Sequence, residues 1–131
     1  MKVLIIEDSA LIRIRLVTLL EGIDGVEIVG QAETAAEGLL ALRQLKPDVL
    51  FLDLQLPDGN GLDVLKVMHQ EGNPTVVVIL TNYPHAQYER RARATGAHAF
   101  LNKARDIFKI PSLLAALMAG EPPHGDRAEQ V

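Results

Sequence analysis

Residues 49–59 read VLFLDLQLPDG, an apolar run that ends in Asp53 and is followed by a turn containing Pro57 and Gly59. Aspartate favours turns and helix caps over strand interiors, so this run predicts a buried strand that ends at Asp53. An aspartate in such a place is ordinarily a solvated turn residue. Whether Asp53 has a further role depends on the residues that end the other strands.

Short apolar runs predict a sheet of five strands. We expect these strands at residues 3–6, 26–30, 49–52, 76–80 and 97–101. The first, third and fourth runs are continuously apolar, which is typical of parallel strands covered by helices on both faces.

Helical patterns occupy the segments between and after these runs. We expect helices at residues 9–21, 34–45, 62–70, 84–95 and 111–119. Thr34 and Glu37 have capping-box spacing, and Pro84 and Pro111 stand in first-turn positions. This alternation predicts an α/β fold with a doubly wound parallel sheet and right-handed crossovers.

The composition indicates one compact domain. The chain has 131 residues, of which 48% are hydrophobic, and a formal net charge of -4. The mild acidic excess argues against direct nucleic-acid binding, which normally uses a basic stripe. The chain has no cysteine, which excludes disulfides and suits a cytoplasmic protein, and no apolar run is long enough to cross a membrane. We expect a domain at residues 1–120 and, because the end of the chain has no apolar face, a flexible tail at residues 121–131.

Polar side chains follow four of the five expected strands. They are Glu7 and Asp8, Asp53, Thr81, and Lys103. Because the carboxyl ends of parallel strands lie along one edge of a sheet, these side chains are expected to converge there. Clustered carboxylates repel one another unless a cation neutralises them, and oxygen ligands of this kind suit Mg²⁺. An aspartate beside the metal can attack phosphorus, while a lysine and a hydroxyl bind the phosphoryl oxygens, so the set predicts phosphoryl transfer to Asp53.

Four segments of the chain resemble the receiver domain of two-component response regulators. They are LIIEDS (4–9), DVLFLDLQLPDGNGLDVL (48–65), VVVILTNY (76–83) and GAHAFLNK (96–103). The similarity extends over about residues 1–120. It implies the flavodoxin-like receiver fold, with strand order 2-1-3-4-5.

The resemblance implies that Asp53 accepts a phosphoryl group from a histidine kinase or a phosphotransfer protein. It also implies that Asp8 and Asp53 bind Mg²⁺ directly and that Glu7 assists through water. The backbone carbonyl of Gln55 would complete the protein ligands.

Other residues take roles in switching and in the lifetime of the phosphorylated state. The resemblance implies that Thr81 and Lys103 contact the phosphoryl group. Phe100 occupies the position of a switching aromatic residue, on a signalling face formed by the fourth helix, fifth strand and fifth helix. Tyr83 and Gln55 each lie two residues beyond a site residue, so we expect them to control hydrolysis by water.

Ala104 departs from the family pattern, which usually has proline after the lysine. A cis bond before alanine would cost roughly 3 kcal/mol, so we expect a trans bond between Lys103 and Ala104. Lys103 and the loop that follows it can then differ in geometry from the family pattern.

Three other function classes compete with a signalling receiver. A haloacid-dehalogenase-type phosphatase would need an acid where Gln55 stands, and a flavin-binding module would place phosphate against the repelling Glu7 and Asp8. A degenerate receiver that binds partners without phosphorylation would lack one of the site residues. The chain is expected to be either a stand-alone receiver or a fragment of a longer regulator.

Several conspicuous residues favour ordinary structural roles. We expect surface positions for the histidines, His69, His85, His98 and His124. Met68 and Met118 fall on apolar helical stripes and are expected in the core. The basic run at 89–93 is expected to be a solvated helix face, and the glycines of DGNG (58–61) to form the turn into the third helix.

Overall fold

The computed structural model describes residues 1–82 and 86–120, in which five parallel strands form one sheet. The sheet order is β2-β1-β3-β6-β7, so β6 and β7 are its fourth and fifth strands and the predicted order 2-1-3-4-5 is confirmed. The strands are β1 (Lys2–Ile6), β2 (Glu27–Ala32), β3 (Val49–Asp53), β6 (Val76–Thr81) and β7 (Ala99–Asn102).

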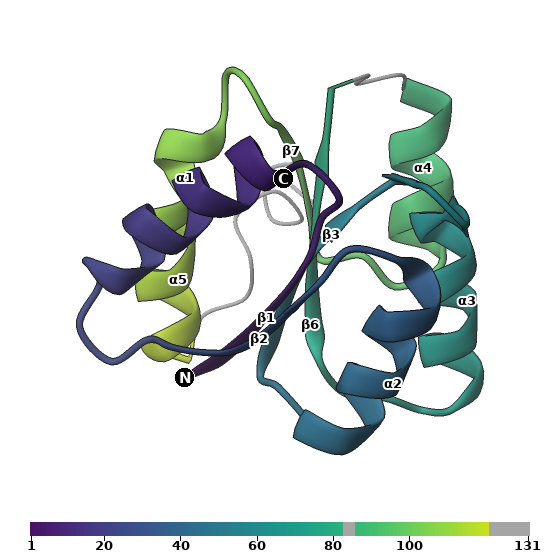
Figure 1. Cartoon of the computed structure of the whole chain (residues 1–131), viewed down its shortest axis with the longest axis horizontal. Helices are drawn as coiled ribbons and strands as arrows, with labels where there is room; N and C mark the ends of the chain where they lie inside the picture. The colour runs from purple at the N-terminus through teal and green to yellow at the C-terminus, as the bar shows by residue number, and fades with distance from the viewer. Residues whose placement is uncertain (83–85, 121–131) are drawn as a thin grey trace.

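Helices cover both faces of the sheet (Figure 1). On one face lie α1 (Ala10–Glu21) and α5 (Ile110–Met118). On the other lie α2 (Ala35–Leu45), α3 (Gly61–Gln70) and α4 (Ala86–Ala94). These bounds are close to the expected ones, although the expected first residue of α4, Pro84, lies outside the described part of the chain.

The central strands contribute alternate residues to two hydrophobic cores. In β1, Leu4 and Ile6 pack on the side of α2 and α3, whereas Val3 and Ile5 pack on the side of α1 and α5. All four side chains are fully buried. Burial of each large aliphatic side chain stabilises the fold by about 1.5–3 kcal/mol, which explains why these strands read as continuous apolar runs.

Side-chain caps fix the starts of three helices. Ser9 Oγ accepts from Ile12 N at 3.3 Å, Thr34 Oγ1 from Glu37 N at 3.1 Å, and Asn60 Oδ1 from Leu62 N at 2.8 Å. The Glu37 carboxylate accepts from Glu33 N, one residue before the cap, instead of completing the expected capping box. The cap at Ser9 starts α1 directly after the acidic pair at the end of β1.

Some short elements and strand ends differ from expectation. β4 (Gln55–Leu56) and β5 (Gly59–Asn60) form a small antiparallel hairpin, and η1 (Ile107–Lys109) precedes α5. β2 continues to Ala32 because it pairs with β1 as far as Ile6. β7 begins at Ala99 because Ala97 N donates to Ala92 O and so belongs to the end of α4.

Two side-chain predictions are wrong. Met118, expected in the core, is the last residue of α5 and is 41% exposed, whereas Met68 is buried as expected. His98, expected on the surface, is half-buried, and its Nδ1 accepts from Val77 N at 3.1 Å. His69 is exposed as expected. The predictions for His85, His124 and the tail at residues 121–131 lie outside the described residues.

Candidate functional site

The carboxyl ends of β1, β3, β6 and β7 bring the predicted site residues to one edge of the sheet. Asp53 ends β3 and is 3% exposed, and Glu7 follows β1 and is 1% exposed. Thr81 and Lys103 are also buried, at 2% and 6% exposure. Asp8 is the exposed member of the group.

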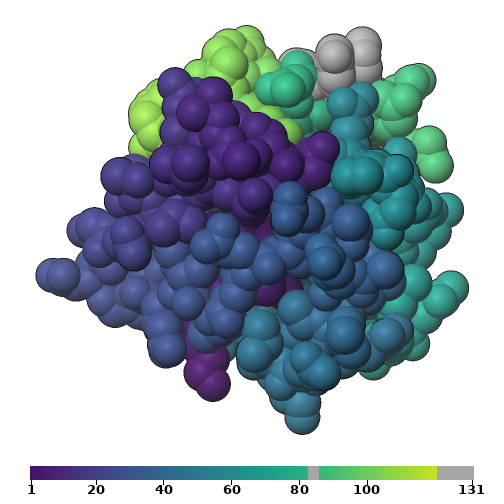
Figure 2. Space-filling view, viewed as in Figure 1, coloured from purple at the N-terminus to yellow at the C-terminus, as the bar shows by residue number. Residues whose placement is uncertain are grey.

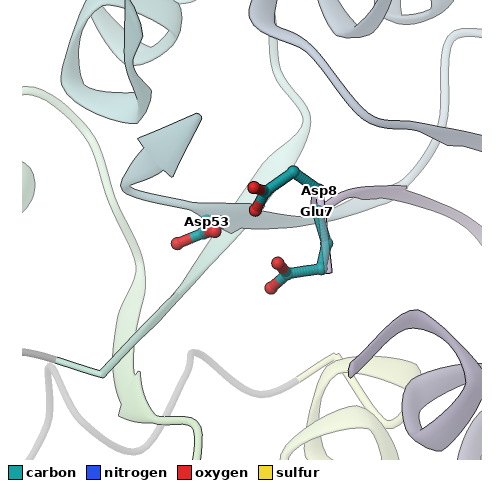
Figure 3. Close-up of side chains that lie close together, drawn as sticks. All are labelled: Glu7, Asp8 and Asp53. Atoms are coloured by element: carbon teal, nitrogen blue, oxygen red, sulfur yellow. The ribbon is translucent and has the colours of Figure 1, made fainter. Parts of the chain in front are cut away.

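Three carboxylates meet at this edge (Figure 3). One carboxylate oxygen from each of Glu7, Asp8 and Asp53 lies within 4.8 Å of the others. Two of the groups are buried and Asp8 opens to solvent, so a cation can enter from that side. A cluster of hard oxygen donors with one open side fits Mg²⁺, which usually keeps several waters.

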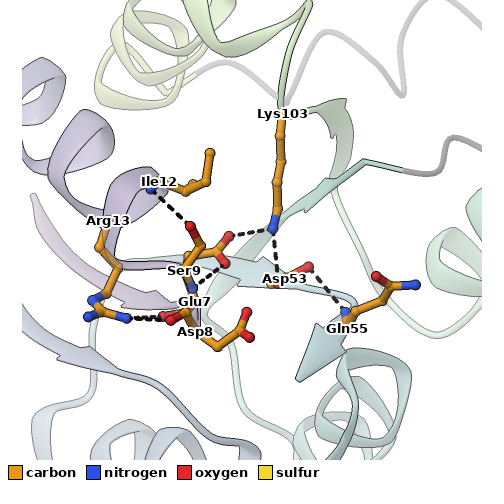
Figure 4. A network of polar contacts seen from close by, with 8 residues as sticks. All are labelled: Glu7, Asp8, Ser9, Ile12, Arg13, Asp53, Gln55 and Lys103. Atoms are coloured by element: carbon orange, nitrogen blue, oxygen red, sulfur yellow. Dashed lines mark hydrogen bonds and ion pairs between the residues drawn. The ribbon is translucent and has the colours of Figure 1, made fainter. Parts of the chain in front are cut away.

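The ammonium of Lys103 lies between two of these carboxylates (Figure 4). Its Nζ is 2.7 Å from Glu7 Oε1 and 3.0 Å from Asp53 Oδ2. Both contacts are short and buried, so the ammonium neutralises part of the charge of the two carboxylates. Among the described residues, one ammonium faces three carboxylates here, so the site keeps an excess of negative charge that suits a further cation.

Burial and charge shift the pKa values of the central pair. Burial raises the pKa of Asp53 to about 7, and repulsion from Glu7 adds to this effect, against the opposing contacts with Lys103 and the Gln55 N–H. Burial alone would lower the pKa of Lys103, but its contacts with Glu7 and Asp53 hold that pKa above its ordinary value. The lysine therefore stays charged, whereas Asp53 needs further positive charge to ionise fully at neutral pH.

Close backbone packing holds Asp53 in place. The Gln55 N–H donates to Asp53 Oδ1 at 3.1 Å, and the Gly61 N–H donates to the carbonyl of Leu54 at 2.8 Å. A Cβ on Gly61 would overlap the Asp53 carbonyl oxygen and lie 3.0 Å from Leu54 Cα. Glycine at position 61 therefore lets α3 begin directly against the end of β3, in agreement with the turn role expected for DGNG.

The remaining predicted site residues lie near the cluster or beyond it. The carbonyl of Thr81 accepts from Lys103 N at 2.9 Å, which joins the ends of β6 and β7. Phe100 is partly buried and packs on the core beneath α3 and α4. The side chain of Gln55 is exposed and points away from the carboxylates in Figure 4. Tyr83 lies outside the described residues, and the functional roles of all four residues stay predictions.

The loop after Lys103 is well held despite the absence of proline. No cis peptide bond occurs in the described residues, so the bond between Lys103 and Ala104 is trans as expected. Asn102 Oδ1 accepts from the Ala104 and Arg105 amides at 2.8 and 2.9 Å, and Asp106 Oδ2 accepts from Asn102 N at 2.9 Å. These bonds keep Lys103 directed at the carboxylates.

Sequence reasoning missed two residues that shape this edge. The carboxylate of Asp58 accepts from the amides of Ala35 and Ala36, at 2.7 and 3.1 Å, and so ties the β4–β5 hairpin to the start of α2. Arg13 Nη1 donates to the carbonyls of Glu7 and Asp8. Asp58 reads as a turn residue and Arg13 as a solvated helix residue, so neither pattern indicates its long-range contact.

The chain is similar to known sequences and structures. The response regulator receiver domain family matches residues 3–115. The chain is 32% identical over 119 residues to BvgA, a putative positive transcription regulator of virulence factors from Bordetella pertussis, covering 91% of this chain and 56% of that protein. It is 36% identical over 114 residues to the sensory transduction protein LytT from Bacillus cereus, covering 87% of this chain and 46% of LytT. The chain thus spans about half the length of these curated relatives.

Solved structures agree with the fold. The signal receiver domain of the putative response regulator NarL from Mycobacterium tuberculosis superposes with a TM-score of 0.84 at 26% identity, covering 92% of this chain and 97% of that one. The signal receiver domain of a putative Luxo repressor protein from Vibrio parahaemolyticus gives a TM-score of 0.82 at 28% identity, covering 98% and 92%. Among the described residues, no helix is both long and apolar enough to span a bilayer.

Proposed function

The chain belongs to the response regulator receiver domain family of two-component signalling, and from this premise we propose that Asp53 is its phosphoacceptor. The phosphoryl donor is a phosphohistidine on a sensor histidine kinase or a phosphotransfer protein. The observation that carries the proposal is the position of Asp53, buried at the end of β3 with Lys103 Nζ at 3.0 Å and two further carboxylates beside it.

Mg²⁺ is the proposed cofactor. Asp8, Asp53 and the backbone carbonyl of Gln55 would hold it directly, and Glu7 would hold it through water. The three clustered carboxylates, which only one ammonium faces among the described residues, support this choice. When bound, the ion neutralises the carboxylates and the phosphoryl oxygens that approach them. Its charge also favours the ionised form of Asp53, whose pKa is raised to about 7 in the protein alone.

The chain's own residues then act in a direct transfer. An oxygen of Asp53 bonds to phosphorus as the bond from phosphorus to the donor's histidine nitrogen breaks. Lys103, which lies 3.0 Å from Asp53 Oδ2, is close enough to move onto a phosphoryl oxygen, and Thr81 supplies a hydroxyl from the end of β6. The same groups assist hydrolysis of the aspartyl phosphate, with Gln55 and Tyr83 controlling the access of water.

The signalling face in this proposal is formed by α4, β7 and α5. Ala92 is the only fully buried side chain of α4 among its described residues, so this helix is weakly anchored and can shift when Thr81 moves. A cavity of about 390 Å³ lies beside Phe100 and Phe108 on this face, which leaves space for a change of the Phe100 rotamer. A phosphorylated chain would bind its partner here.

The proposed partners are therefore proteins: an upstream phosphodonor and a downstream target. In this proposal, the chain does not itself bind nucleic acid. Its proposed location is the cytoplasm. Because the matched relatives are about twice as long, the target is either a further domain of the same regulator or a separate protein.

The test is phosphorylation by a small phosphodonor such as phosphoramidate, with and without Mg²⁺. Intact-protein mass spectrometry should show one phosphoryl group in the wild type only when Mg²⁺ is present, and none in Asp53→Asn. Asp63→Asn is the matched control, because Asp63 is an exposed aspartate in the first turn of α3. Wild-type phosphorylation of Asp53→Asn would refute Asp53 as the acceptor.

A further inference from the structure

Arg13 connects the acidic pair to two other parts of the chain. This residue lies in α1, and its Nη1 donates to the carbonyl oxygen of Glu7 at 2.8 Å and to that of Asp8 at 3.0 Å (Figure 4). The same nitrogen is 3.4 Å from Glu33 Oε1, beyond the end of β2. The Arg13 side chain is only 17% exposed, so it is packed in the fold and does not extend into solvent.

The Arg13 side chain can reach the loops after β1 and after β2 because these two loops lie side by side. In the space-filling view, the purple start of the chain and α1 lie against the blue segment that contains the end of β2 and α2 (Figure 2). Glu7 N donates to Ala32 O at 2.9 Å, which continues the pairing of β1 and β2 past the last strand residue. Beyond the end of this pairing, Arg13 makes an ion pair with Glu33 in the loop that follows β2.

The Asp8 side chain depends on this backbone anchor more than the other two acids do. Glu7 has contacts with Ser9 N and Lys103, and Asp53 has contacts with Gln55 N and Lys103. The carboxylate of Asp8 is exposed and makes no hydrogen bond or ion pair with any residue in the described ranges 1–82 and 86–120. The direction of Asp8 is therefore set by its backbone, whose carbonyl is one of the two that Arg13 binds.

We propose that Arg13 is a positioning residue that holds the Asp8 carboxylate toward Asp53 and so increases the affinity of the site for Mg²⁺. This inference rests on the proposed function, since it concerns the same metal site. The direction of the change in Mg²⁺ affinity distinguishes this role from a simple effect of charge. Removal of a positive charge near a cation site should by itself strengthen Mg²⁺ binding, whereas removal of a positioning contact should weaken it.

Three variants separate these effects. Arg13→Ala removes both the charge and the two hydrogen bonds. Arg13→Lys keeps the charge but replaces the planar guanidinium by a single ammonium. Arg15→Ala is the matched control, because Arg15 is exposed on the same helix and makes no contact with the described residues that could position the acids.

Mg²⁺ affinity is measured by isothermal titration calorimetry. Thermal unfolding of the same proteins is measured separately in EDTA. Arg13→Ala should bind Mg²⁺ on the order of 10-fold more weakly than the wild type, as is usual for loss of a residue that orients a metal ligand. Arg13→Lys should fall between the two, and Arg15→Ala should bind as tightly as the wild type or slightly tighter. A merely structural role would lower the unfolding temperature in EDTA and leave the Mg²⁺ affinity of the folded protein unchanged.

Each other outcome counts against the inference. Equal or tighter Mg²⁺ binding by Arg13→Ala would overturn it, as would an equal loss in Arg15→Ala. If Arg13→Ala does not fold, Arg13→Lys decides, and wild-type affinity in that variant overturns the inference. A wild-type chain that does not bind Mg²⁺ would overturn the proposed metal site itself, which distinguishes that failure from a failure of the role of Arg13.

Discussion

Replacement of Gly61 by alanine should damage both the fold and the loop that follows Asp53 (residues 54–60). A Cβ at this position would overlap the carbonyl oxygen of Asp53 and lie 3.2 Å from its carbonyl carbon and 3.0 Å from Leu54 Cα. All of these neighbours are backbone atoms, so no side chain can rotate away to relieve the overlap. The start of α3 and the end of β3 must therefore move apart.

The magnitude follows from three effects. Overpacking against rigid neighbours costs about 2 kcal/mol. The hydrogen bond from Gly61 N to Leu54 O, 2.8 Å long, would be stretched, with a loss of about 1 kcal/mol. Alanine stabilises a helix by at most about 1 kcal/mol relative to glycine, which offsets part of the loss. The net change is a destabilisation of about 2 kcal/mol, which lowers the unfolding temperature by roughly 6–10 °C for a domain of this size.

Circular dichroism during heating measures this change, and Gly22→Ala is the control. At Gly22 the nearest atom to an added Cβ is Leu19 O at 3.5 Å, an ordinary contact, and the backbone has φ -81°. Gly22→Ala should therefore be neutral or slightly stabilising. Phosphorylation of Gly61→Ala by phosphoramidate should also slow, because the Asp53 carbonyl is displaced. Wild-type unfolding temperature and wild-type phosphorylation in Gly61→Ala would refute the close packing on which the reasoning depends.

Three further changes test the charges and the backbone. In EDTA, Asp53→Asn should be more stable than the wild type at pH 8: a carboxyl whose pKa is raised from 3.8 to about 7 stabilises the fold while protonated and loses that contribution as pH rises through this range. The difference in unfolding temperature between Asp53→Asn and the wild type should therefore increase as the pH rises from about 4 to about 7. A difference that stays constant over this range would contradict the prediction. Mg²⁺ should raise the unfolding temperature of the wild type but not of Asp8→Asn, and an equal response would exclude Asp8 as a ligand. Lys46→Gly should raise the free energy of unfolding in urea by about 1 kcal/mol, because Lys46 caps α2 with φ 46°, a left-handed conformation that glycine adopts more easily. A lower free energy of unfolding in the glycine variant would contradict this.

The sheet was predictable because its central strands are covered on both faces. Such strands are apolar at nearly every position, so residues 49–52 and 76–80 indicate their structure without help from the rest of the chain. The β4–β5 hairpin gives no such signal, since each strand has only two residues. His98 was misjudged because its role depends on a distant backbone amide, that of Val77, which a local pattern does not reveal.

The candidate site was predictable where it follows from topology. Parallel strands end on one edge, so Glu7, Asp53 and Lys103 could be grouped from their places after apolar runs. The contacts among them depend on side-chain reach, and no spacing rule indicates that Lys103 contacts both acids. The anchors outside the strand ends, such as Asp58, depend on loops that come together only in the folded chain.

Because Asp58 makes two contacts with α2, two amide protons of that helix can report on the motion of the loop that follows Asp53. The amide protons of Ala35 and Ala36 are held by a carboxylate from the β4–β5 hairpin and by no turn of their own helix. Any excursion of that hairpin must release both protons to solvent, so their exchange rates measure how often the loop opens. A nuclear magnetic resonance experiment could therefore follow the loop beside Asp53 from two backbone signals on a different helix, without a label at the site.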